Sequence, residues 1–227
     1  MGKYVIATTK SWNIDNVQKL KSKYQDEEIF LITEKEDLTK CYLEETKPKY
    51  VFFPHWSWII PPEIYENYRC VVFHMTDLPY GRGGSPLQNL IVRGIYQTKV
   101  SAIAVEEGMD TGAIYFKEPM DISSGNADDI LTRVSDIVFG KMIPRFIGKE
   151  PVPVKQEGEI VAFKRRTPDD SEIPDGLSQR QLYDYIRMLD GEGYPTAYKD
   201  VGDLRIYFRN AQLVGDTVRT ETSIIKR

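Results

Sequence analysis

The sequence predicts an α/β protein with a Rossmann-like, mostly parallel sheet, followed by a small β-rich carboxyl-terminal subdomain. Three observations lead to this prediction. Short apolar runs alternate with segments of helical periodicity over residues 1–150, a proline-rich segment (148–154) ends the alternation, and strand-like runs flank one helical segment beyond it. Strands that alternate with helices favour right-handed crossovers between parallel strands. We therefore predict two domains, 1–150 and 151–227.

Six runs in the first domain have the β-branched and aromatic content of buried strands. They are residues 3–9, 28–33, 49–54, 69–73, 99–105 and 113–122. Segments with apolar residues at helical spacing separate most of them: 15–24, 38–45, 63–68 and 86–93. A longer helix is expected from Asn126, with two aspartates in its first turn, to about Pro144.

The second domain is expected to be smaller and richer in strands. It should contain a strand at 159–164, a charged turn at 164–171 and a capped helix at 178–189. The runs 204–208 and 212–214 are expected to form a hairpin or a fragment of a small barrel. A turn as charged as 164–171 is more often solvated than part of a phosphate site.

The composition is that of an ordinary globular protein, with 41% hydrophobic and 28% charged residues and a net charge of −4. We expect a cytoplasmic protein, because the chain has no apolar run of membrane-spanning length and its amino terminus lacks a signal peptide. Cys41 and Cys70 suggest neither a disulfide framework nor a metal site. Acidic and basic residues are nearly balanced beyond residue 151, which argues against a large nucleic-acid partner.

The stretch 70–89 (CVVFHMTDLPYGRGGSPLQN) has the pattern of a functional loop. His74 falls at the carboxyl end of a predicted strand, which is where open α/β sheets bind ligands. Ser85 is expected to cap a helix that starts at Pro86. A lone histidine is alternatively a structural residue bonded to the backbone. No G-x-G-x-x-G follows the first strand and no P-loop occurs, so neither motif predicts a dinucleotide or ATP site.

Two segments resemble a known family. Residues 74–86 (HMTDLPYGRGGSP) resemble the H-x-S-L-L-P-x-Y-R-G-x-x-P stretch of the 10-formyltetrahydrofolate-dependent formyltransferases, and residues 107–112 (EGMDTG) resemble their x-G-x-D-T-G loop. Asp110 follows His74 at about the family's spacing, and 58–61 (WIIP) is similar to the family's x-I-L-P segment. The resemblance implies the formyltransferase fold, with residues 1–150 as catalytic domain, a formyltransferase activity, 10-formyltetrahydrofolate as co-substrate and no metal.

The version of the loop at 82–86 (RGGSP) is similar to the methionyl-tRNA and sugar branches of the family. The short, slightly acidic tail favours the sugar N-formyltransferases, and within them the pseudaminic-acid type. The expected substrate is a nucleotide-linked amino dideoxy sugar for cell-surface or flagellar glycans, with folate as the other partner, no nucleic acid, no membrane and a homodimeric assembly. The alternatives are a methionyl-tRNA formyltransferase-like enzyme and a non-catalytic homologue that binds folate or a nucleotide sugar.

The resemblance also implies roles for particular residues. His74 would be the acid/base and oxyanion partner, and Asp110 would orient it and relay a proton. Alternatively, Asp110 caps its own turn, Trp58 and Ile60 pack the core, and Arg82 holds its loop. The implied sets are His74 and Asp110 as catalytic residues; Trp58, Ile60, Leu78, Val105 and Glu106 as the folate slot; and Tyr80 and Arg82 on the substrate side.

One position departs from the family. The family has an asparagine two residues before the histidine, and this chain has Val72. Valine cannot donate a hydrogen bond, and the loss of one oxyanion donor typically costs about 2.7–4 kcal/mol in the transition state. Either another group replaces it, or the protein is slow, or it is not an enzyme. His55 and Thr76 are the nearest polar candidates, and we hypothesise that His55 or a backbone amide takes this role.

Overall fold

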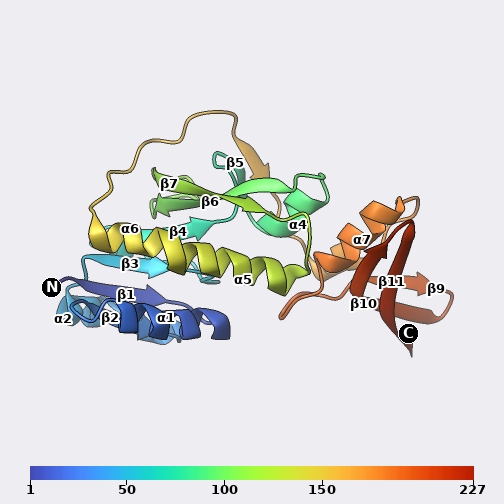
Figure 1. Cartoon of the computed structure of the whole chain (residues 1–227), viewed down its shortest axis with the longest axis horizontal. Coiled ribbons are helices and arrows are strands. Elements are labelled where there is room, and N and C mark those ends of the chain that lie inside the picture. Colours follow the sequence, from blue (N-terminus) through green and yellow to red (C-terminus); the bar gives the residue numbers. More distant parts are fainter. The chain divides into compact units, whose positions relative to one another are not determined.

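The computed structural model describes all 227 residues and has a six-stranded mixed sheet as its largest element (Figure 1). The strand order is β2-β1-β3-β4-β6-β7. β1 pairs in parallel with β2 and β3, β3 pairs in parallel with β4, and β6 is antiparallel to β4. The strands are β1 (Lys3–Ala7), β2 (Glu28–Ile32), β3 (Tyr50–Phe53), β4 (Cys70–His74), β6 (Gln97–Ala104) and β7 (Ile114–Asp121). The predicted α/β class with a mostly parallel sheet is confirmed.

Helices supply apolar side chains to both faces of this sheet. α2 (Lys40–Thr46) and α3 (Pro62–Tyr65) place Leu43 and Ile64 in one cluster with Val5, Val51 and Phe53. On the other face the Phe146 ring packs at 5.1 Å from Tyr50 and 5.2 Å from Phe52. Successive strand residues alternate between the two faces because the side-chain period of a strand is two. α1 (Ser11–Lys23) follows β1 and buries Val17 and Leu20.

The long helix expected between residues 126 and 144 consists of three segments. α5 (Ala127–Ile137) leads into a π-helical turn (Val138–Met142), and α6 (Ile143–Gly148) follows. Pro144 lies in the first turn of α6 rather than near the end of the helix. Proline is tolerated there because an N–H in the first turn has no partner within its own α-helical segment.

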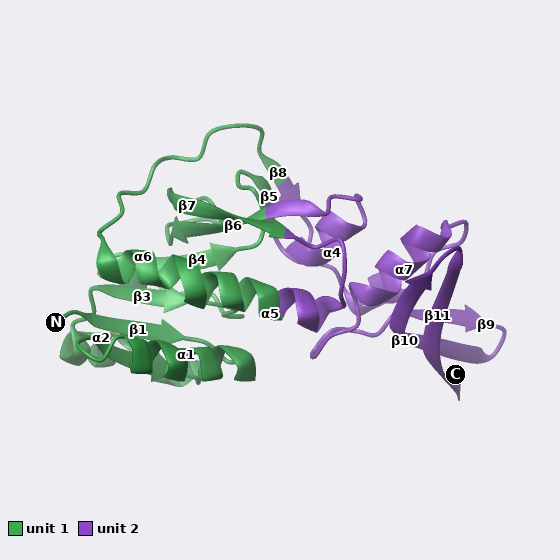
Figure 2. Ribbon diagram, viewed as in Figure 1, with its two compact units in different colours: residues 1–82, 99–120, 132–161 green, residues 83–98, 121–131, 162–227 purple.

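The chain divides into two compact units, each assembled from three ranges (Figure 2). Unit 1 comprises residues 1–82, 99–120 and 132–161, and unit 2 comprises 83–98, 121–131 and 162–227. The predicted domains were instead single ranges that meet at residue 150, and that division stays a prediction.

The hairpin expected between 204–208 and 212–214 is not formed, because both runs lie in the single strand β10 (Leu204–Val214), which has an irregular register between Arg209 and Gln212. Instead, β10 pairs with β11 (Thr217–Lys226) and β9 (Tyr198–Val201) in a three-stranded antiparallel sheet of unit 2, in the order β11-β10-β9. The Ser178 hydroxyl caps the first turn of α7, as expected for a capped helix. Ser85, by contrast, precedes α4 in a left-handed conformation, and its hydroxyl accepts from Arg166 N at 3.0 Å instead of capping that helix. The remaining elements are β5 (Tyr80–Gly83), α4 (Pro86–Ile91), β8 (Val161–Phe163), α7 (Gln179–Arg187), β9 (Tyr198–Val201), β10 (Leu204–Val214) and β11 (Thr217–Lys226).

Arg187 is buried within unit 2, where each of its three side-chain nitrogens donates a hydrogen bond. Its Nε donates to Asp184 Oδ1 at 2.6 Å, and its two terminal nitrogens donate to Gly125 O at 2.9 Å and Ile122 O at 3.0 Å. Breaking such a buried pair leaves an uncompensated charge. This network therefore links α7 to the segment that precedes α5. Every helix is too short or too polar to cross a bilayer.

The two cysteines differ in exposure, which predicts a difference in reactivity. Cys41 is exposed, whereas Cys70 lies in β4 and its burial raises the pKa of its thiol to about 12. The reactive species is the thiolate, so native protein at pH 8 should label with a thiol reagent at one site and unfolded protein at two. The Cys41→Ser variant should not label when native. Equal native labelling rates at both cysteines would contradict the burial of Cys70.

Candidate active site

His74 ends β4 with its imidazole buried and fixed by the backbone. Nε2 lies 2.7 Å from Gly81 O. A carbonyl oxygen only accepts, so Nε2 carries the proton of this bond. The Thr76 hydroxyl also donates to Gly81 O at 3.4 Å, and its own carbonyl accepts from the Ser101 hydroxyl at 2.7 Å. The backbone partner expected for a structural histidine is therefore present. Because this bond uses Nε2, Nδ1 remains available to interact with another group.

Nδ1 of His74 faces Asp110, with 3.4 Å between Nδ1 and Oδ2. β6 runs antiparallel to β4, with Val71 opposite Ala104 and His74 opposite Ser101. The loop after β6 therefore starts beside the amino end of β4, and it folds back along that strand to bring Asp110 to His74. Asp110 has φ 55°, a left-handed conformation that aspartate tolerates better than most residues. The structure thus brings the two predicted catalytic residues together.

Gln156 ties the Asp110 loop to the segment around β5. Its side-chain nitrogen donates to Asp110 O and Gly112 O, each at 2.8 Å. Its side-chain oxygen accepts from Arg82 Nε at 3.1 Å and Nη2 at 2.9 Å. Arg82 was expected on the substrate side, but these bonds correspond to the alternative of an arginine that holds its loop. Sequence reasoning missed Gln156, because a glutamine in a proline-rich linker has no pattern that marks it.

The residues expected to line the folate slot lie in several places. Ile60 and Val105 belong to or pack against one apolar cluster, which also includes Val72. Trp58 packs on Trp56, with 4.7 Å between ring centroids, and Glu106 accepts from Ala113 N at 3.4 Å. Leu78 is fully buried in the loop before β5, where the Leu78–Pro79 peptide bond is cis, and Tyr80 begins β5.

A second polar group lies where β1 and β3 end. Asn13 Nδ2 is within hydrogen-bond distance of Thr8 Oγ1 at 2.7 Å and His55 Nδ1 at 3.0 Å, and Asn13 Oδ1 accepts from the Ser135 hydroxyl at 2.6 Å. His55 Nε2 is buried without a hydrogen-bond partner. Burial, with a smaller effect of the Lys10 charge, lowers the pKa of His55 from 6.5 to about 4. His55 is therefore neutral at physiological pH.

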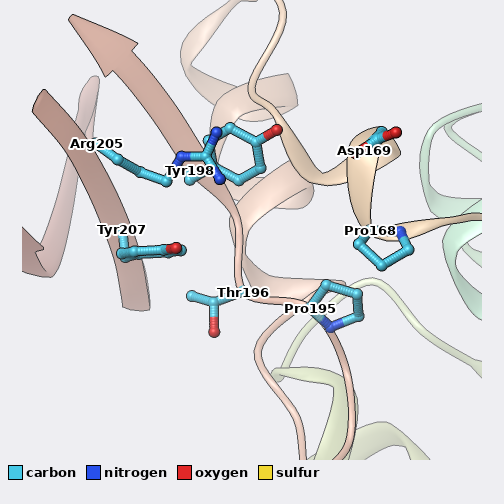
Figure 3. Close-up of a pocket in the computed structure, with 7 residues that line it drawn as sticks. All are labelled: Pro168, Asp169, Pro195, Thr196, Tyr198, Arg205 and Tyr207. Carbon is cyan, nitrogen blue, oxygen red and sulfur yellow. The ribbon is translucent and has the colours of Figure 1, made fainter. Parts of the chain in front are cut away.

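A pocket of about 290 Å³ is lined entirely by residues of unit 2 (Figure 3). The Arg205 guanidinium lies 3.8 Å from the centroid of the Tyr198 ring and forms two bonds with the Asp200 carboxylate, at 2.8 and 2.9 Å. None of the predicted site residues lines this pocket. Its lining consists of Pro168, Asp169, Pro195, Thr196, Tyr198, Arg205 and Tyr207. No group of three or more His, Cys, Asp or Glu side chains is arranged to hold a metal ion.

Comparison with known proteins matches two family models. Residues 17–147 match the family described as formyl transferase, and residues 168–225 match the model described as methionyl-tRNA formyltransferase, C-terminal domain. The chain belongs to the formyl transferase family. The family predicted from His74, Asp110 and their loops is thereby confirmed.

Solved structures and curated relatives narrow the comparison. A structure described as methionyl-tRNA formyltransferase from Clostridium thermocellum is 51% identical, with a TM-score of 0.96 over 100% of both chains. The methionyl-tRNA formyltransferase of Gluconobacter oxydans is 34% identical over 137 residues, 60% of this chain and 44% of the relative, and that of Thermodesulfovibrio yellowstonii is 27% identical over 170 residues, 72% and 54% respectively. The chain spans about half the length of these curated relatives.

More distant structures share the fold alone. A sugar N-formyltransferase from Shewanella is 18% identical, with a TM-score of 0.73 over 94% of this chain and 99% of that chain. HypX from Aquifex aeolicus in complex with tetrahydrofolic acid is 16% identical, with a TM-score of 0.75 over 92% and 38%.

These comparisons correct the predicted branch of the family. The prediction of a nucleotide-linked amino sugar of the pseudaminic-acid type, with no nucleic-acid partner, is wrong. The relatives with substantial identity are named for methionyl-tRNA, whereas the sugar enzyme is similar only at 18% identity. The tail that suggested the sugar branch itself matches a methionyl-tRNA formyltransferase domain. A balanced net charge over a segment says nothing of how its charges are distributed over a surface.

The bonds of Gln156 predict a measurable loss of stability when they are removed. Gln156→Ala should lower the free energy of unfolding by about 1–3 kcal/mol, because it leaves two carbonyls and a guanidinium of the part-buried site without their partner. Urea unfolding measures this change. Lys155→Ala, at the exposed neighbouring position, is the matched control and should be near neutral. Equal stability of the two variants would show that the hydrogen bonds of Gln156 make no net contribution to the free energy of unfolding.

The lowered pKa of His55 predicts a loss of stability in acid. The folded chain has a His55 pKa of about 4 and the unfolded chain about 6.5, so the unfolded state binds more protons between these values. The contribution of neutral His55 to the free energy of unfolding is therefore fully present above pH 6.5. It decreases by about 3 kcal/mol as the pH falls to 4. Urea unfolding between pH 7 and 4.5 should show a smaller pH dependence for His55→Gln than for the wild-type chain. Parallel curves would contradict a neutral, buried His55.

Proposed function

We propose that this chain transfers the formyl group of 10-formyltetrahydrofolate to the amino group of methionyl-tRNA. The observation that supports this most directly is the 51% identity to the Clostridium thermocellum structure along the whole of both chains. The match of residues 168–225 to the C-terminal domain model of methionyl-tRNA formyltransferases is a second support. The folate donor accords with family membership. A cytoplasmic location stays a prediction.

The reaction requires two bond changes and one proton transfer. The amine attacks the formyl carbon, the new C–N bond forms, and the carbonyl oxygen becomes an oxyanion. Collapse of this intermediate breaks the bond to the folate nitrogen N10, which takes up the proton that the amine has lost. The products are the N-formylated amine and tetrahydrofolate, so atoms and charges balance without a metal or an oxidant.

His74 and Asp110 are the groups we assign to the proton transfer. Nε2 of His74 is bonded to Gly81 O, so Nδ1 and the Asp110 carboxylate form the acid/base pair that takes the amine proton and returns it to N10. The 3.4 Å between them leaves room for shortening when substrate binds, as catalytic hydrogen bonds often do. Asp110 acts through its carboxylate, while Gln156 fixes its backbone.

We assign the pteridine slot to the apolar cluster that contains Ile60 and Val105, with Trp58 at its exposed side and Glu106 and Leu78 on the adjoining loops. Such slots combine apolar walls with a few fixed polar groups. Tyr80, at the start of β5, remains assigned to the substrate side. Arg82 acts through Gln156, because its guanidinium is already bonded there.

The test is formation of formylmethionyl-tRNA by the purified chain. With 10-formyltetrahydrofolate and methionyl-tRNA, mass spectrometry of the hydrolysed aminoacyl group should detect formylmethionine, and His74→Ala and Asp110→Ala should each lower kcat at least about 100-fold, the size expected for loss of acid–base catalysis. Lysyl-tRNA and free methionine are the control acceptors. Folate binding without product would instead support the alternative of a binding homologue, which Val72 suggested.

A further inference from the structure

Buried N–H groups without partners gather where β1 and β3 end. They are Trp12 Nε1 in the first turn of α1, and His55 Nε2 and Trp56 Nε1 just after β3. The rings of Trp12 and His55 are in edge contact, with 6.4 Å between centroids. Native proteins pair nearly all buried donors, and an unpaired one costs free energy. Such a group of donors could be satisfied by a hydrogen-bond acceptor that binds from outside the chain.

The tautomer of His55 is fixed by a chain of hydrogen bonds with one consistent direction. Asn16 Nδ2 donates to Ser135 Oγ at 2.9 Å, and Ser135 Oγ donates to Asn13 Oδ1 at 2.6 Å. This orients the Asn13 amide so that its NH₂ group faces Thr8 and His55. An amide nitrogen only donates, so His55 Nδ1 is the acceptor and Nε2 carries the proton. His55 is therefore a preset neutral donor, and its low pKa keeps it so over the physiological range.

His55 follows β3 at the edge of the sheet where His74 ends the neighbouring strand β4. β3 and β4 are parallel neighbours with Phe53 opposite Val72, so His55 and His74 each follow that pair by two residues. The pairing itself ends at Phe53 and Val72, and His55 lies in the turn that follows, with φ 52°. β1 and β3 also flank the position where the strand order changes direction, since β1 connects to β2 on one side and β3 to β4 on the other. Ligands bind at such a position in open α/β sheets.

We propose that His55 is a catalytic residue that donates its Nε2–H to the formyl oxygen, the role for which Val72 has no donor. This inference rests on the proposed formyl transfer. As the amine attacks, the π electrons of the C=O bond move to oxygen. The hydrogen bond that His55 Nε2–H donates to that oxygen then becomes stronger, because the oxygen gains negative charge. When the C–N10 bond breaks, the C=O bond re-forms. His55 keeps its proton throughout, and the moving proton passes through His74 and Asp110.

Two variants separate donation from packing. His55→Phe keeps a flat ring without a donor and should lower kcat about 100-fold with little change in KM, because the bond is strongest in the transition state. His55→Gln keeps an N–H at a similar reach and should retain activity within about tenfold of the wild-type chain. If His55→Phe raised KM and left kcat unchanged, the assignment to the formyl oxygen would be overturned. Such a result would mean that His55 donates to an oxygen of the acceptor substrate equally in the ground state and the transition state. If kcat and KM of His55→Phe equalled those of the wild-type chain, the proposal that His55 binds the substrate would be overturned.

A spectroscopic measurement does not depend on turnover. The chain has two histidines, so ¹⁵N-histidine labelling with His74→Ala for assignment gives one ring to observe. We expect the Nε2–H tautomer of His55 at pH 7, and a shift of its Nε2 resonance when 10-formyltetrahydrofolate is added. An Nδ1–H tautomer, or an Nε2 resonance that folate leaves unmoved, would overturn the proposal. If the wild-type chain makes no formylmethionyl-tRNA, the proposed function fails; if it does and His55→Phe equals it, only the role of His55 fails.

Discussion

The parallel pairing of β1, β3 and β4 in one register is the constraint on which the rest of the site depends. Because parallel strands end at the same edge, the residues that follow them are brought side by side although they are far apart in sequence. His74 ends β4, Thr8 directly follows β1, and His55 is the second residue after β3. A shift of one residue in the pairing of β4 would turn the side chain of His74 to the opposite face of the sheet.

A second constraint is the reversal of direction between β4 and β6. Antiparallel pairing carries the chain away from His74 as β6 proceeds, so the loop that bears Asp110 has to return along β4. A loop that returns in this way needs support that regular pairing does not supply. Gln156 provides it from the linker, through two bonds to loop carbonyls and two from Arg82.

Features that depend on local sequence patterns could be predicted from the sequence. Hydrogen bonds between side chains that are far apart in the sequence could not. The alternation of apolar runs and helical segments was enough for the α/β class, and the paired loops were enough for the family and for His74 with Asp110. The antiparallel direction of β6 was not anticipated, because an apolar run has the same pattern in either direction. The bonds of Gln156, and those of Asn13 with Ser135, join residues more than forty positions apart and leave no periodicity to detect. The substrate branch was inferred from net charge and tail length, which do not describe a surface.

The position of Gln156 bears on how this protein can be divided or recombined. A chain cut at the proline-rich linker, after residue 150, would include His74 and Asp110 but would lack the side chain that fixes the Asp110 loop. A hybrid that joins the first 150 residues to another carboxyl-terminal part would therefore need to carry the linker with it. A fragment that keeps the site complete must therefore extend beyond the six-stranded sheet and include Gln156.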